Sequence, residues 1–241
     1  MSGRLSLGEP ERRSLAAGAA AFGFSLDARK LDLFCRFADL LGLWSARVSL
    51  ISCRTARELV ERHFVDSLAV GPWIRDAATV VDLGSGAGFP GVPLAMVHPE
   101  KRLILVEPRR RRANFLRETR RVLGLRNAQI VEARAEEGSR SVDLPLADVV
   151  VCRAVWAGAG ALLVTPAWLR PSGTLICMKG SGARARAESA QTERPAREGS
   201  EKLERKKLSQ VDEMLLECSV TYRIGAGRRR ALDVYRRCPE N

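Results

Sequence analysis

An aspartate and three glycines occupy alternate positions in the stretch VVDLGSGAGFPGVPLA, residues 80–95, namely Asp82, Gly84, Gly86 and Gly88. The stretch begins with β-branched apolar residues, which indicates a strand that ends in a glycine-rich turn. Glycines in such a turn let the backbone approach a ligand closely. The turn lacks the lysine of a phosphate-binding GxxxxGK[ST] loop, and Phe89 stands where a dinucleotide-binding GxGxxG motif has its third glycine. The spacing therefore argues against both of those ligands.

A second acidic residue, Glu107, ends the apolar run RLILVE at residues 102–107. In an open α/β sheet, ligands bind at the carboxyl ends of the strands, so Glu107 and the glycine turn are expected at one edge. A carboxylate there can accept hydrogen bonds from both hydroxyls of a ribose, while Asp82 offsets positive charge nearby. A ligand that combines a ribose with an amino acid and a sulfonium, and carries no phosphate, is S-adenosylmethionine. The sequence predicts that cofactor, with a ligand-free strand-to-helix corner as the alternative.

Five short apolar runs, separated by helix-compatible sequence, indicate the sheet that holds these residues. They are residues 79–83, 102–107, 128–133, 147–152 and 173–178. Strands that alternate with helices, such as the helix expected over 109–124, form parallel sheets wound on both faces. We therefore predict an α/β fold, a Rossmann-like sheet with helices on both faces. Together with the cofactor predicted above, this fold is that of a class I S-adenosylmethionine-dependent methyltransferase. Residues 181–207 lack apolar periodicity and predict a mobile insertion, and residues 219–238 predict two strands joined by a turn.

The N-terminal part of the chain follows a helical pattern instead. Asp27 can cap one amphipathic helix, and Thr55 and Glu58 form a capping box ahead of another. We predict that residues 1–75 form an N-terminal helical extension and that residues 76–241 form the methyltransferase domain.

The chain of 241 residues is strongly basic, with a formal net charge of +12 and a pI of about 10.2. A balance of this size favours a polyanionic partner, most simply nucleic acid. An arginine-rich genome would produce the same composition without such a partner, and charge alone does not distinguish RNA from DNA. We take nucleic acid as the expected partner.

The six cysteines are widely scattered, and no two of them have the CxxC spacing. This pattern argues against a zinc site and is typical of reduced thiols in the cytosol. The N-terminal residues lack the apolar segment of an export signal, and the longest apolar stretch, residues 16–24, is too short to span a membrane. We expect a cytoplasmic protein with neither a bound metal nor a membrane segment.

Several segments from about Leu31 to the C-terminal strands are characteristic of one family: ERHFVDSL, VVDLGSGAGFPGVPLAMVHP, LVEPRRRRANFLRE, LGLRNAQIVEARAEE, VVCRAV and CMKG. In these segments the sequence resembles the small-subunit ribosomal RNA guanine-N7 methyltransferase family, also known as the glucose-inhibited-division B family. The resemblance implies transfer of a methyl group from S-adenosylmethionine to N7 of a guanine in a 16S rRNA loop near the decoding centre. It also implies the small ribosomal subunit as the partner.

The positions that match the family's cofactor-contacting residues follow the first four predicted strands. They are Gly84 and Phe89 after the first, Glu107, Pro108 and Arg109 after the second, Ala135 and Glu136 after the third, and Arg153 after the fourth. In the resemblance the second group contacts the ribose, the third holds the adenine, and Arg153 lies near the methyl-transfer side. With Asp82, Gly86 and Gly88 they form the predicted cofactor site. The structural alternatives are a core role for Phe89, a surface charge at Glu136 and a strand-end cap at Arg153.

Three basic residues are predicted to contact RNA: Arg110 and Arg112 in the RRRR run, and Lys179 at the end of the fifth strand. The alternative for each is an ordinary solvated surface residue. His63 and Asp66 lie three residues apart on a predicted helix. We interpret them as a buried hydrogen-bonded pair rather than as catalytic groups.

Guanine N7 carries a free lone pair, so it can attack a sulfonium methyl without first losing a proton. No general base is needed, and we predict no catalytic acid–base residue. The protein would align N7, the methyl carbon and the sulfur and exclude water. Because the major groove of A-form RNA is deep and narrow, the target base is expected in a loop or extruded.

Two other classes of function stay open. A methyltransferase for a protein or a small molecule would need a selective substrate pocket and would show no salt-sensitive RNA binding. A ribosome-binding factor would bind subunits and transfer no methyl group.

Overall fold

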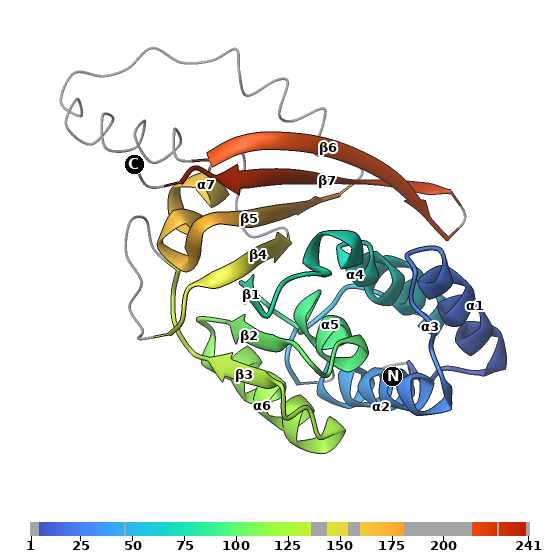
Figure 1. The fold of residues 1–241 in the computed structure, drawn as a ribbon. Helices are drawn as coiled ribbons and strands as arrows, with labels where there is room; N and C mark the ends of the chain where they lie inside the picture. The colour runs from blue at the N-terminus through green and yellow to red at the C-terminus, as the bar shows by residue number, and fades with distance from the viewer. Residues whose placement is uncertain are drawn as a thin grey trace, which may run out of the picture.

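The computed structural model describes residues 5–45, 47–135, 144–153, 160–180, 214–225 and 227–239. Within them, seven strands form one sheet in the order β3-β2-β1-β4-β5-β7-β6 (Figure 1). The strands are β1 (Thr79–Leu83), β2 (Arg102–Val106), β3 (Ala128–Val131), β4 (Ala147–Arg153), β5 (Leu169–Lys179), β6 (Met214–Ile224) and β7 (Arg228–Arg237). Strands β1 to β5 pair in parallel, and β7 lies antiparallel between β5 and β6.

The predicted strands and the predicted fold class are confirmed. Each of the five apolar runs forms a parallel strand, and residues 219–238 form most of the β6–β7 hairpin. Strand β6 begins earlier than the sequence indicated, at Met214, because it pairs with β7 as far as Arg237. The architecture is a Rossmann-like α/β sheet with an antiparallel hairpin at one edge.

Alternation along the strands divides the apolar residues between two cores. On β2, Leu103 and Leu105 face the first core and Ile104 and Val106 face the second, as the period of two in a strand requires. The first core is covered by α5 (Gly91–Val97), α6 (Arg110–Leu123) and the N-terminal helices, and the second by α7 (Gly160–Val164) and η3 (Thr165–Trp168). Figure 1 shows the N-terminal helices grouped on one side of the sheet. Helices therefore cover both faces, as predicted.

Two of the N-terminal helices, α2 (Ala28–Ser45) and α3 (Ala56–Leu59), begin where the sequence placed their caps. The others are α1 (Glu9–Ala20), the π-helix η1 (Val60–Val65), α4 (Asp66–Leu68) and η2 (Gly71–Ile74). The backbone N–H of Lys30 donates to Asp27 Oδ1 at 2.7 Å, and that of Glu58 donates to Thr55 Oγ1 at 3.1 Å. The Glu58 carboxylate accepts from the N–H of Arg54, one residue before the expected partner. The helix after Thr55 contains a π-helical turn that the sequence did not predict.

The N-terminal helices and the sheet share one core. Phe37 of α2 stacks near Phe64 of η1, Phe89 of the glycine turn and Phe115 of α6, with ring centroids 5.8, 5.4 and 6.4 Å away. The two parts of the chain therefore pack together. The division at residue 75 into an extension and a methyltransferase domain stays a prediction.

Two of the predictions lie outside the described residues, the cofactor contact at Glu136 and the insertion at 181–207.

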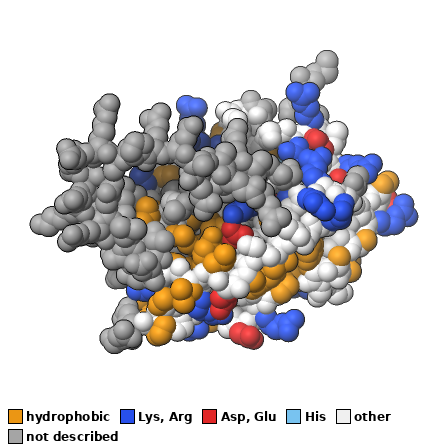
Figure 2. All heavy atoms as spheres, turned by 90° about the horizontal axis from the view of Figure 1, so that it is seen from above, with side chains coloured by type: hydrophobic (Ala, Val, Ile, Leu, Met, Phe, Trp, Pro, Cys, Tyr) orange, Lys and Arg blue, Asp and Glu red, His pale blue; other side chains and the backbone are white. Residues whose placement is uncertain are grey.

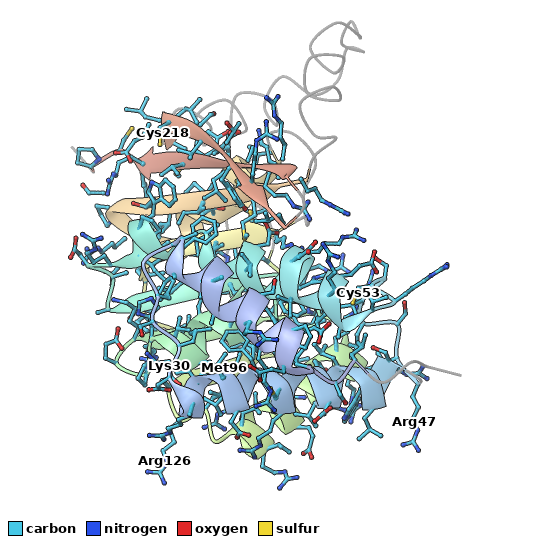
Figure 3. All side chains as sticks on the ribbon, turned by 90° about the vertical axis from the view of Figure 1, so that its right-hand side faces the viewer. Lys30, Arg47, Cys53, Met96, Arg126 and Cys218 are labelled. Carbon is cyan, nitrogen blue, oxygen red and sulfur yellow. The ribbon has the colours of Figure 1, made fainter. Side chains whose placement is uncertain are left out.

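No helix in the described part of the chain is long and apolar enough to cross a membrane. The described residues also contain no group of three or more histidine, cysteine or acidic side chains placed to hold a metal ion. The separation of Cys53 from Cys218 in Figure 3 illustrates how far apart two of the thiols lie.

Candidate functional site

The glycine turn after β1 is tied to the end of β2 through backbone and carboxylate hydrogen bonds. The N–H groups of Gly84 and Ser85 donate to the carbonyl of Val106 at 2.8 and 3.0 Å. The buried Glu107 carboxylate then accepts from the N–H of Gly86 at 2.9 Å and from that of Arg109 at 2.9 Å. The two motifs that the sequence analysis combined are therefore in direct contact.

Gly88 and Gly86 have different structural roles in this turn. A Cβ on Gly88 would lie 2.6 Å from Val92 Cγ2, so Gly88 permits close packing inside the protein. A Cβ on Gly86 would meet nothing nearer than 3.8 Å. The backbone of Gly86 has φ +57, in the left-handed region that glycine adopts most easily. A Cβ there would be in ordinary van der Waals contact with Arg112 and Gly84, and the backbone of Gly86 lines an open space.

That open space is a cavity of about 510 Å³ at the carboxyl ends of β1, β2 and β4. Its lining comes from five regions of the chain and consists of Leu50, Ile51, Ser52, His63, Gly84, Ser85, Gly86, Ala87, Phe89, Glu107, Pro108, Arg109, Arg112 and Arg153. The cavity thus brings together seven of the predicted cofactor residues, from the ends of three different strands. Its volume is within the range of small-molecule sites.

A larger hollow of about 700 Å³ lies at the opposite edge of the sheet, beside Arg102 at the start of β2 and Ala128 at the start of β3. Ligands of open α/β sheets bind at the carboxyl ends of the strands. The cavity beside the glycine turn is therefore the candidate site.

Several predicted residues lie outside this cavity lining. Asp82 and Gly88 lie behind the glycine turn, and Ala135 packs partly buried against the second core. Arg110 is exposed in the first turn of α6, and Lys179 forms an ion pair with Asp233. Their assignments to cofactor or RNA stay predictions.

Asp82 holds the start of helix α5. It is 1% exposed, and its Oδ2 accepts from the N–H of Gly91 at 2.9 Å, while Oδ1 has no hydrogen-bond partner among the described residues. Burial raises the pKa of Asp82 from 3.8 to about 7. The charge expected to face the cofactor is therefore buried one layer deeper, where it fixes the turn.

We expect Asp82→Asn to change how stability depends on pH. Because the pKa in the folded protein lies above its ordinary value, the folded state binds the proton more tightly than the unfolded state between pH 4 and 7. This contribution is fully present below pH 4 and is lost as pH rises through 7. The stability of Asp82→Asn relative to the wild type should therefore rise by about 2–3 kcal/mol between pH 5 and pH 8.

Urea unfolding of both proteins at the two pH values measures this difference, in which the titration of all other groups cancels. A stability difference that stays the same at pH 5 and pH 8 would show that the Asp82 pKa is ordinary.

Asp66 of α4 links the π-helical turn to β4 and to the hairpin. Its carboxylate accepts a hydrogen bond from Tyr222 Oη at 2.7 Å and pairs with Arg153 at 3.3 Å and Arg230 at 3.6 Å. The prediction of a hydrogen bond between His63 and Asp66 is wrong for His63 Nδ1, because this atom has no hydrogen-bond partner among the described residues. Asp66 faces β4 and the hairpin instead, so its structural role is confirmed with different partners.

Sequence reasoning missed one wall of the cavity. The Leu50–Ser52 segment lines it, and Arg112 lies beside it and donates to the carbonyl of Ser49 at 3.2 Å. Arg112 was expected to face RNA, and the structure places it in the lining of the candidate cavity. Nothing in the short apolar segment signals a ligand, because its side chains carry no distinctive chemistry.

Comparison with known proteins identifies the family. The model of the family described as rRNA small subunit methyltransferase G matches residues 30–216. Proteins named ribosomal RNA small subunit methyltransferase G are similar to the chain: that of Xanthomonas campestris pv. campestris (strain B100) is 42% identical over 168 residues, covering 67% of this chain and 77% of the relative. That of Myxococcus xanthus (strain DK1622) is 36% identical over 166 residues, covering 69% and 76%.

Among solved structures, the precorrin-6y C5,15-methyltransferase of Geobacter metallireducens has a TM-score of 0.47 at 16% identity, covering 78% of this chain and 90% of that one. A likeness at this level carries no argument about function. The family match extends over the glycine turn, Glu107 and Arg153, which line one cavity. This chain belongs to the rRNA small subunit methyltransferase G family.

Proposed function

We propose that this protein transfers the methyl group of S-adenosylmethionine to N7 of a guanine in a 16S rRNA loop near the decoding centre. As a member of its family it is an rRNA methyltransferase of the small subunit. The observation that carries the cofactor part of the proposal is the contact between Gly86 and Glu107, which joins a glycine backbone to a strand-end carboxylate within one cavity. The RNA target is proposed from the family to which the chain belongs. We infer that the enzyme acts in the cytoplasm, on the small ribosomal subunit.

The residues present fit S-adenosylmethionine. Each oxygen of Glu107 accepts one backbone N–H, and a carboxylate oxygen has a further lone pair that can accept from a ribose hydroxyl. Gly86 lines the cavity beside this carboxylate, and a Cβ there would meet nothing nearer than 3.8 Å, so the backbone can approach the cofactor. Arg153, at the end of β4, has its NH1 atom buried without a partner among the described residues, and an anionic or carbonyl group of a ligand would satisfy it.

When bound, the cofactor supplies the electrophilic methyl group. The chain's own residues position the reactants: Glu107 holds the ribose end of the cavity, and Phe89 and Arg153 shape the opposite end, 6.0 Å apart from ring centroid to guanidinium carbon. No residue needs to remove a proton. Burial and the neighbouring Arg153 lower the pKa of His63 to about 3, which makes it a poor general base, as the reaction allows.

Basic side chains near the cavity are proposed to contact the RNA backbone. Arg110 is exposed at the start of α6, beside the cavity residue Arg109. Figure 2 shows Lys and Arg side chains gathered toward the end of the viewed face at which Figure 1 places the β6–β7 turn. Around that turn Arg223, Arg228 and Arg229 are exposed. We add these residues to Arg110 and Lys179 as candidates for phosphate contacts.

We expect Arg110→Glu to weaken binding of the small subunit without changing the affinity for S-adenosylmethionine. The loss should shrink as salt rises, because phosphate contacts depend on counterion release. The matched control is Arg126→Glu, which makes the same change of charge at an exposed position on the outer edge of the molecule (Figure 3). Equal losses for the two variants in a filter-binding titration would show that only net charge matters.

Incubation of small subunits with methyl-labelled S-adenosylmethionine tests the proposed function. We expect label in 16S rRNA. Label in a ribosomal protein would support the alternative methyltransferase, and tight subunit binding without any label would support the binding factor.

A further inference from the structure

The end of the cavity opposite Glu107 includes His63, to which the proposed cofactor site gives no role. His63 of the π-helical turn packs on Phe89 with ring centroids 4.8 Å apart. Arg153 also lines this end of the cavity. Arg153 is fixed in place, since its NH2 atom donates to the carbonyl of Arg62 at 2.7 Å and pairs with Asp66. His63 and Arg153 therefore both lie against Phe89, on the wall of the cavity.

The imidazole of His63 is left with one free donor. Its Nδ1 is buried and has no hydrogen-bond partner among the described residues. We assign the proton to Nε2, because a proton on Nδ1 would be a buried donor without an acceptor. Because the side chain lines the cavity, this N–H is available to a ligand.

The ring is also neutral. Burial lowers the pKa of His63, and the charges of Arg153, Arg62 and Arg230 lower it further. A neutral donor suits a base that becomes cationic on N7 methylation, because an imidazolium ion at this position would repel the product.

The Hoogsteen edge of guanine presents two acceptors, N7 and O6, whereas adenine has an amino donor in place of O6. During transfer the N7 lone pair forms the bond to the methyl carbon as the carbon–sulfur bond breaks. O6 is then the acceptor that remains for the protein. A single N–H donor beside the methyl-transfer end can both select guanine and orient N7.

We propose that His63 is a specificity-determining residue that donates a hydrogen bond to O6 of the target guanine and thereby holds N7 toward the methyl group. The proposal rests on the guanine-N7 function proposed above. His63 lies in the π-helical turn, and such turns are frequent at functional sites.

The first arm of the test compares His63→Ala, His63→Gln and the wild type on reconstituted small subunits. We expect His63→Ala to lower kcat/KM by about 10- to 100-fold, as for loss of a hydrogen bond that discriminates a base. The Kd for S-adenosylmethionine, measured by calorimetry, should stay near the wild-type value. His63→Gln keeps an N–H donor of similar size and should recover part of the activity. His98→Gln is the matched control, because the chain's other histidine pairs with Glu100 and lies outside the cavity.

The second arm replaces the target guanosine by 2-aminopurine riboside, which keeps N7 and lacks O6. The wild type and His98→Gln should prefer guanine, and His63→Ala should lose that preference. Should His63→Ala fail to fold by circular dichroism, His63→Leu, which also lacks the donor, takes its place. An undiminished preference in a folded variant without the donor overturns the proposal for His63. A wild-type protein that leaves guanine N7 unmethylated overturns the proposed function instead.

Discussion

Gly86→Val is expected to abolish binding of S-adenosylmethionine while the protein still folds. The new side chain would start at a position with no atom nearer than 3.8 Å, so its methyl groups would enter the cavity rather than the protein interior. The left-handed backbone at φ +57 adds a cost of about 1–2 kcal/mol for a residue with a Cβ. Calorimetric titration of the folded variant should give no binding heat at concentrations that saturate the wild type.

The matched control for this variant is Gly124→Val. Gly124 ends helix α6 with φ +65, and a Cβ there would meet nothing within 4 Å. The two variants therefore carry the same backbone strain, and only one of them fills the cavity. We expect similar losses of stability and normal cofactor binding in Gly124→Val. Near-normal affinity in folded Gly86→Val would contradict the position assigned to the cofactor.

Glu107→Ala is expected to lower the affinity for S-adenosylmethionine by about 1–3 kcal/mol, measured by calorimetry. The substitution removes the proposed ribose acceptor and also releases the N–H groups of Gly86 and Arg109. Glu118→Ala is the control, because Glu118 pairs with Arg121 on the surface of α6 and is remote from the cavity lining. An unchanged Kd in Glu107→Ala would remove Glu107 from the site.

The parts of the site that the sequence predicted are those fixed by strand ends. Gly86 and Glu107 are 21 residues apart, yet each follows an apolar run, and neighbouring parallel strands bring their carboxyl ends together. Arg153, which the sequence analysis took from the family resemblance, also lies at a strand end, that of β4. For Gly86 and Glu107, residue type and periodicity were sufficient because the geometry of the sheet is regular.

The parts that the sequence analysis missed depend on packing, which the spacing of apolar residues along the chain does not reveal. The segment LVERHFVDSL has the spacing of an ordinary amphipathic helix, and its π-helical turn arises from contacts with β4 and the hairpin. Asp82 was expected to lie at the ligand. The alternating Asp and Gly residues of the motif gave no sign that the Asp82 side chain is buried against the start of α5. Arg110 and Arg112 are two residues apart, so a helix points them in different directions, and only the fold shows which one meets the cavity.

The central claim, transfer to guanine N7 in 16S rRNA, is tested most directly by the chemistry of the product base. A guanine methylated at N7 is cationic and has a weakened glycosidic bond, so borohydride followed by aniline cleaves the RNA chain at that base. Small subunits incubated with the protein and S-adenosylmethionine should yield RNA that is cut at one guanine in a loop near the decoding centre. RNA from reactions without protein, without cofactor, or with Gly86→Val should remain uncut at that site. Methyl label in 16S rRNA that resists this cleavage would contradict the assignment to N7.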